Sequence, residues 1–267
     1  MAKKVFPKIS LSFSKEQLSD FLLKIKELSK IDDKIVFKLT NNNLLLYSTI
    51  TKGKQIYAFK SFIFETKSIM SLHDELISEV TLIIKDSKKF VLNLANYLEF
   101  DFEVDVELSY GEINGQIFSD MIKFSNGKLK ISLAAGDPVN INTSITIENI
   151  SKFSDVKNAL FNFELNAETY ARIKKMGTIN SQAKKTTTPS DIDPLILSVS
   201  DKKLLIGENK WSLDIGEIDR EDESFSFPKK YFNTMNIPDK ATIYVFDSFI
   251  LSKTESSELL ITMETTV

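Results

Sequence analysis

The chain has no cysteine, one histidine (His73) and only eight glycines in 267 residues. The missing cysteine excludes disulfide bonds, a thiol nucleophile and a thiolate metal site. A histidine-based catalytic triad would have to be built on His73 alone. The glycines are scattered, and the turn at Gly207 lacks the spacing of a phosphate-binding loop. We therefore expect a protein that is not an enzyme, has no catalytic residues and uses no cofactor.

Long apolar runs are also missing. No segment approaches the roughly 18–20 apolar residues that a membrane helix needs. The N-terminal Met1–Pro7 is not followed by the apolar core of a signal peptide. We expect a soluble, cytoplasmic protein with no membrane partner. Its hydrophobic content of 42% can fill the core of two domains or of one large β domain.

The positive charge lies mainly in four stretches that we predict to be helical: 14–30, 87–98, 166–185 and 227–236. Together they contain 13 Lys or Arg and 4 Asp or Glu, a net charge of +9, whereas the whole chain carries −3. The remainder therefore carries −12. This division indicates a protein that holds a polyanion on one face. The alternative is that helix surfaces simply attract lysine.

A repeated pattern links the two halves of the chain. Val36–Leu46 reads as strand, polar turn and strand, and Ile196–Ile206 repeats this pattern 160 positions later. A predicted helix precedes each copy. The first begins at Ser14 with Gln17 three positions later, which is a capping-box pattern. The second begins at Asn166, which is also a favourable N-cap residue.

A second match follows in each half. Lys88-Lys89-Phe90 comes after the predicted strand Val80–Lys85, and Lys229-Lys230-Tyr231 comes after Glu223–Phe227. Each half then continues with alternating strands. We predict an α+β fold with two similar domains, each with two helices packed on antiparallel sheets. The predicted divisions are an N-terminal domain over 1–140, a connector over 141–158 and a C-terminal domain over 159–267, with 65–78 unassigned.

Acidic residues alternate with apolar residues along Phe100–Leu108, which is the pattern of a half-buried strand. Four carboxylates in alternation could bind a metal ion. A solvated strand face that discourages edge aggregation explains them better, so we expect no metal site. Later, Asn126-Gly127 separates two apolar segments and predicts a tight hairpin turn.

Lysines spread over several helices can neutralise phosphates without reading bases, because duplex DNA carries about one negative charge per 1.7 Å of axis. Lysine is a mobile point charge, whereas the arginine fork makes bidentate contacts with guanine. Only Arg172 and Arg220 are arginine, so 32 of the 34 cationic residues are lysine. This composition favours loose, sequence-independent binding of duplex DNA.

The chain resembles the DNA polymerase sliding clamps, and most of all the T-even bacteriophage type. The resemblance rests on the repeated units Ser14–Leu46 and Asn166–Ile206, on the two Lys-Lys-aromatic helices and on Ala134–Pro138 before the connector. It implies the sliding-clamp fold, a closed ring with helices inside and strands outside. With two domains per chain, as in proliferating cell nuclear antigen, the ring would be a homotrimer. It would encircle duplex DNA, tether a DNA polymerase, be opened by an ATP-driven clamp loader and act in the host cytoplasm if phage-encoded.

The resemblance also implies site residues. The DNA-facing set would be Lys24, Lys30, Lys88, Lys89, Arg172, Lys175, Lys184, Lys185, Lys229 and Lys230. A partner-peptide pocket would involve Pro138, Val139, Ile141, Leu259 and Ile261. Two alternatives remain open: a processivity factor of the same fold that acts as a monomer or dimer, and a structural β-rich protein of a viral assembly.

Overall fold

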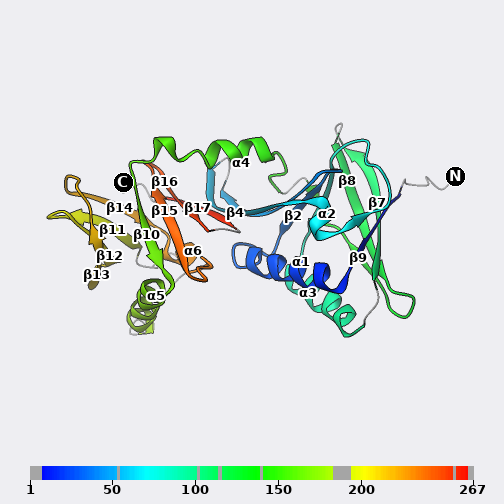
Figure 1. Cartoon of the computed structure of the whole chain (residues 1–267), viewed down its shortest axis with the longest axis horizontal. Coiled ribbons are helices and arrows are strands. Elements are labelled where there is room, and N and C mark those ends of the chain that lie inside the picture. The colour runs from blue at the N-terminus through cyan, green and yellow to red at the C-terminus, as the bar shows by residue number, and fades with distance from the viewer. Residues whose placement is uncertain are drawn as a thin grey trace. The chain divides into compact units, whose positions relative to one another are not determined.

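The computed structural model describes residues 8–52, 55–100, 103–113, 116–138, 141–182, 194–254 and 257–263. The chain divides into two compact units, which Figure 1 shows together. The first unit comprises Met1–Ile50 and Lys60–Lys152, and the second comprises Thr51–Phe59 and Phe153–Val267. The division after Lys152 therefore falls inside the segment 141–158. None of the helices in these ranges has the length and hydrophobicity that a membrane crossing requires.

The first unit is one mixed sheet with helices on it. Its strands are β1 Lys8–Phe13, β2 Ile35–Leu39, β3 Asn43–Lys52, β4 Gln55–Glu65, β5 Ser71–Leu72, β6 Val80–Ile84, β7 Val104–Ile113, β8 Gln116–Ser125 and β9 Lys130–Ala134. Its helices are α1 Lys15–Leu28, α2 Thr66–Ile69, α3 Ser87–Ala95 and the 3-10 turn Asn96–Glu99, and α4 Ile147–Phe153 crosses the division. The strand order is β4-β3-β2-β6-β8-β7-β1-β5, with β9 also paired to β8. The pair β6–β8 is parallel, and the pairs β1–β7, β2–β3, β2–β6, β7–β8 and β8–β9 are antiparallel.

The second unit contains two sheets. Its elements are β10 Phe161–Asn166, α5 Ala167–Gln182, β11 Leu195–Ser200, β12 Lys203–Glu208, β13 Trp211–Glu217, β14 Glu223–Phe227, α6 Lys229–Phe232, β15 Lys240–Val245, β16 Phe249–Lys253 and β17 Glu258–Thr262. One sheet has the order β10-β15-β16-β17 and continues to β4, whose first residues belong to this unit; the other has the order β13-β12-β11-β14.

The repeat that the sequence predicts is present in both units. The Ser14 side chain accepts from the backbone N–H of Gln17, and the Gln17 side chain accepts from the backbone N–H of Ser14, so the predicted capping box begins α1. The Asn166 side chain accepts from Thr169 N–H at 2.8 Å and begins α5 in the same way. Each helix leads into an antiparallel hairpin, β2–β3 or β11–β12. The second hairpin turns through Asp201 and Lys202, which both have positive φ as a type I′ turn requires.

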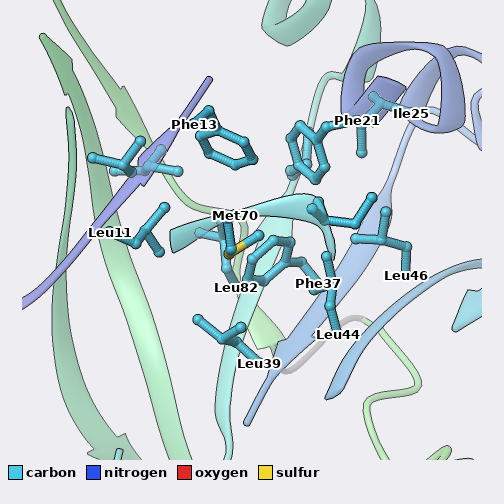
Figure 2. Packing of buried hydrophobic residues seen from close by; sticks show 14 of the residues in the cluster. Leu11, Phe13, Phe21, Ile25, Phe37, Leu39, Leu44, Leu46, Met70 and Leu82 are labelled. Carbon is cyan, nitrogen blue, oxygen red and sulfur yellow. The ribbon is translucent and has the colours of Figure 1, made fainter. Parts of the chain in front are cut away.

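An aromatic core holds the helices of the first unit on its sheet. α1 and α3 lie side by side over one sheet face (Figure 1). The Phe21 ring on α1 lies 5.2 Å from Phe13, 6.0 Å from Phe37 and 6.3 Å from Phe90. Figure 2 shows Phe13, Phe21 and Phe37 within the same apolar cluster. α1 thus buries one face, on which Leu18, Phe21, Leu22, Ile25 and Leu28 recur at helical spacing.

Other expectations need adjustment. The unassigned stretch 65–78 contains α2 and β5, and the polar connector contains the helix α4. The strand expected at Phe100–Leu108 is β7, which begins later, at Val104, and continues to Ile113. The Asn126-Gly127 turn is present between β8 and β9, with Gly127 at φ +82°. A positive φ costs glycine little because it has no Cβ.

Candidate nucleic-acid interface

In the first unit, the outward faces of α1 and α3 carry exposed lysines. Lys30 follows the last turn of α1 and is exposed, as are Lys88 and Lys89 in the first turn of α3. Lys88 is 75% exposed and lies 3.6 Å from Asp33 Oδ1, a distance at which an exposed ion pair contributes little. Three of the four predicted DNA-facing lysines in this unit are thus exposed on the surface, where a polyanion can bind.

Lys24 is the exception. Only 16% of its side chain is exposed, its ammonium lies 5.2 Å from the centre of the Phe62 ring, and Asp20 lies 3.6 Å away. The expectation of an outward-pointing Lys24 is wrong because α1 packs on β4 at this position. The ammonium group lies over the Phe62 ring and its charge interacts with the ring face.

In the second unit, α5 and α6 provide a smaller cationic set. Arg172 and Lys175 are exposed on α5, and Lys230 is exposed on α6. Arg172 pairs with Glu168 one turn earlier, an ion pair in which both side chains are largely exposed. Lys184 and Lys185 lie outside the described residues.

Lys229 is not a solvated cation. Only 12% of its side chain is exposed, and its Nζ lies 2.6 Å from Oε1 of Glu208 on β12. The same Nζ donates to the backbone carbonyl of Gly177 on α5 at 2.9 Å. The expectation of a phosphate-facing Lys229 is wrong because its first-turn position on α6 points the side chain between α5 and β12.

Sequence reasoning left out two exposed lysines of the same faces. Lys26 is exposed on α1, and Lys174 is exposed on α5 beside Lys175. It also missed the Glu208 partner of Lys229. A signal was present, since an isolated glycine such as Gly177 weakens a helix interior and points to a packing constraint.

The partner-peptide pocket stays a prediction, but two of its residues need correction. Leu259 and Ile261 are 3% and 0% exposed on the central strand β17. Both side chains therefore belong to the core. Pro138 and Ile141 are half-buried, and Val139 lies outside the described residues.

The start of the connector packs against the first unit. The Tyr47 hydroxyl on β3 donates to the Asn142 carbonyl at 2.8 Å, and Ile145 and Ile150 are buried. Burial, together with the nearby Glu79 charge, raises the pKa of the Tyr47 phenol. This part of the connector is therefore held on the sheet by apolar and polar contacts.

The other residues that were considered for catalysis or metal binding make contacts that stabilise the fold. His73 Nε2 lies 3.1 Å from the Ser12 hydroxyl on β1. Glu107 accepts from Lys8 and Lys123, and the hydrogen bond from Lys8 is the main reason that its pKa is lowered. Within the described ranges, no three His, Asp or Glu side chains form a group that could hold a metal ion.

Two units of this topology, each with helices on one face of antiparallel strands, define the sliding-clamp fold. Comparison with solved structures finds this fold in bacterial DNA polymerase III β subunits. The β chain from Streptococcus pneumoniae superposes with a TM-score of 0.63 at 13% identity, over 97% of this chain and 66% of its own. The β subunit from Borrelia burgdorferi gives 0.63 at 12% identity, over 96% and 65%. The Helicobacter pylori β clamp, solved with a DNA ligase peptide, gives 0.61 at 12% identity, over 97% and 67%.

The likeness is one of fold. Comparisons with protein-family models and with curated proteins find no match. The chain spans about two thirds of the length of these β subunits. What the chain binds and how it assembles therefore has to be argued from its own residues.

Proposed function

We propose that the chain is a DNA polymerase sliding clamp, a ring that encircles duplex DNA and tethers the replicative polymerase. One observation carries the proposal: on the sliding-clamp fold, the helices of both units carry exposed cations, whereas the chain outside the four cationic stretches is acidic. We infer that these helices together form the wall that faces DNA.

The proposed DNA-facing set is Lys26, Lys30, Lys88, Lys89, Arg172, Lys174, Lys175 and Lys230, with Lys184 and Lys185 as untested members. Seven of the eight described members are lysine. Solvated ammonium groups neutralise phosphates without fixing a register on the base pairs. Such a wall holds DNA weakly and lets it slide.

The ring would contain three copies joined head to tail. Among the described residues, β9 pairs only with β8 and β13 only with β12, so both strands have an open edge. Leu133 on β9 and Leu213 on β13 are only half-buried, so each edge has an incomplete apolar layer. Exposed Lys130 on β9 and Asp214 on β13 have opposite charges. Unpaired edges of this kind favour pairing with another chain, and a heterologous contact generates a ring when its rotation closes.

The proposal includes partners of two kinds: a DNA polymerase that docks a peptide near the connector, and an ATP-driven loader that opens the ring in the cytoplasm. The β clamp of H. pylori was solved with a DNA ligase peptide, which supports peptide docking as a property of this fold. Two units per chain and three chains per ring are also what the resemblance to T-even clamps implies.

The test combines mass and topology. Native mass spectrometry should give three times the chain mass of 30.4 kDa. Protein loaded on nicked circular duplex DNA should stay bound in high salt and leave when the circle is cut, because a ring slides off an end. A monomer would support the non-ring processivity factor instead. Large polymers without DNA retention would support a structural assembly protein.

A further inference from the structure

The second unit contains a buried charge that the proposed DNA contacts do not use. Lys229 begins α6, and its Nζ lies 2.6 Å from Oε1 of Glu208, whose side chain is 5% exposed. The angles of this contact are poor for a hydrogen bond, so it is an ion pair. The hydrogen bond of Nζ goes instead to the Gly177 carbonyl on α5, at 2.9 Å. One ammonium group therefore joins α6, β12 and α5.

The helix α5 has a glycine, Gly177, at the point where the Lys229 ammonium group approaches it. A Cβ at Gly177 would lie 2.7 Å from Lys229 Cε, 2.9 Å from its Nζ and 3.0 Å from Glu208 Oε1. Real Cβ atoms essentially never approach other heavy atoms below 3.0 Å. Glycine weakens a helix interior relative to alanine, so its presence here favours the lysine contact at the expense of the helix itself.

Over residues 167–177, the part of α5 whose side chains are described, few apolar side chains are buried. Among the α5 residues whose side chains are described, the buried apolar ones are Tyr170 and Ile173, whereas α1 buries five. A second polar contact supplements them, since the Tyr170 hydroxyl donates to the carbonyls of Phe232 at 3.1 Å and Met235 at 2.9 Å. Two polar tethers, one near each end of its described side chains, thus connect α5 to α6 and the residues after it.

We propose that Lys229 and Glu208 are positioning residues that orient α5, and so direct Arg172 and Lys175 toward the duplex. The proposal rests on the sliding-clamp function. Arg172 and Lys175 lie on the solvent side of α5, while Tyr170, Ile173 and Gly177 lie on the buried side. Rotation or lifting of α5 would therefore move its cations directly. A buried ion pair often contributes little to net stability compared with an apolar pair of similar volume, and such pairs are sometimes retained for structural specificity.

The experiment replaces both charges by unbranched apolar side chains, in the double variant Lys229→Met/Glu208→Met. This change removes the tether without leaving a buried charge unpaired. Lys230→Met is the matched control, because it removes one cation from the next position of α6 where the side chain is exposed. Amide hydrogen exchange reports on α5, with α1 as the internal reference. Equilibrium binding to short linear duplex DNA at several salt concentrations reports on the cations.

In the double variant we expect the amides of α5 to exchange on the order of tenfold faster, with α1 unchanged. The slope of the log binding constant against log salt should fall by about three, because Arg172, Lys174 and Lys175 all lie on α5. Lys230→Met should leave α5 exchange unchanged and lower the slope by about one. Unchanged exchange in the double variant would overturn the tether. Faster exchange with an unchanged slope would overturn the positioning role.

Gly177→Ala keeps the test decisive if the double variant does not fold. Alanine is the better helix former, so a local effect alone would slow exchange in α5. If the tether orients the helix, the new Cβ displaces Lys229 and exchange becomes faster. If the unmodified protein itself does not stay on circular DNA, the sliding-clamp proposal fails and the positioning role fails with it, while the exchange data still decide whether the tether holds α5.

Discussion

The Lys60 ammonium on β4 lies 2.9 Å from Oε2 of Glu27 on α1, and the Lys60 side chain is 1% exposed. The Phe62 ring lies 5.5 Å from the same ammonium. Burial lowers the pKa of Lys60, and Glu27 partly opposes this effect. A buried lysine on β4 thus holds the long helix of the first unit, much as Lys229 holds α5 in the second.

Glu27→Gln should destabilise the protein by about 2 kcal/mol. This is less than the roughly 3–5 kcal/mol for breaking a buried pair, because the amide oxygen can still accept from Lys60. The lost carboxylate leaves a buried cation without a counter-charge. Urea unfolding at neutral pH measures the change as a shift of the midpoint at constant slope.

The matched control is Glu65→Gln, which removes a carboxylate from β4, the strand that carries Lys60. Glu65 lies 3.1 Å from Lys67 in an exposed pair, with side chains 68% and 86% exposed. Such a pair contributes about 0–1 kcal/mol, so this variant should unfold almost as the parent does. Equal shifts in the two variants would show that burial of Lys60 does not matter for stability.

Charge reversal tests the proposed DNA wall. Changing Lys88, Lys89, Lys175 and Lys230 together to Glu should abolish binding to short linear duplex DNA at low salt, because four phosphate contacts become repulsive. The fold should survive, since all four side chains are exposed and surface changes usually alter stability by less than about 0.5 kcal/mol each. Lys229 is left out of the set because it is buried. Gel filtration at high salt and thermal unfolding check that the variant remains assembled and folded.

The control reverses four other exposed lysines, Lys67, Lys202, Lys203 and Lys240. The change in net charge is the same, so any general repulsion from DNA affects both variants equally. Binding to the linear duplex should fall much less in this control. Equal losses in the two variants would contradict the assignment of the DNA wall to the four helices.

The sequence predicts the elements of this protein better than the surroundings of its charges. The capping residues Ser14 and Asn166, the two hairpins and the Asn126-Gly127 turn depend on neighbours within a few residues, and all are present. The face that α1 buries follows from local sequence too, because apolar side chains such as Phe21 recur at helical spacing.

The burial of individual lysines could not be predicted from their neighbours in the sequence. Lys24 and Lys229 look like other helix lysines in sequence, yet one lies over Phe62 and the other pairs with Glu208. These partners are distant along the chain, and only the packing of the helix on its sheet brings them together. The same limit applies to Leu259 and Ile261, because their 3% and 0% exposure depends on what packs on the sheet face and not on their own strand.

Alkaline pH should destabilise the protein through its buried tyrosines. Burial raises the pKa of Tyr170, so its phenol stays neutral in the folded state above the ordinary value of 10.0. The unfolded state releases that proton first and binds fewer protons between 10.0 and the raised pKa. Stability therefore falls as pH rises through this window, by up to about 1.4 kcal/mol per pH unit for each such group.

The variant Tyr170→Phe isolates the contribution of this phenol to the pH dependence of stability. At neutral pH the variant should be less stable by about 1–2 kcal/mol, because the carbonyls of Phe232 and Met235 lose their donor. Above about pH 10 the deficit should shrink, since phenylalanine does not ionise. Urea unfolding of parent and variant at several pH values measures the difference in unfolding free energy. The effects of other titrating groups such as Lys60 are the same in both proteins and cancel. A deficit that stays constant with pH would contradict the argument.

Leu213→Asp should separate the chains while leaving each one folded. Leu213 lies on the open edge strand β13 and is half-buried within the single chain, so the folding cost of the change is about 1 kcal/mol. In the proposed ring the side chain enters the apolar layer beside β9 of the next copy, where a carboxylate would lie without a partner. Native mass spectrometry should then show the single chain. Ser212→Asp is the control, because the neighbouring side chain is exposed on the other face of the strand and should leave the trimer intact. Trimers in both variants would place the subunit contact elsewhere than β13.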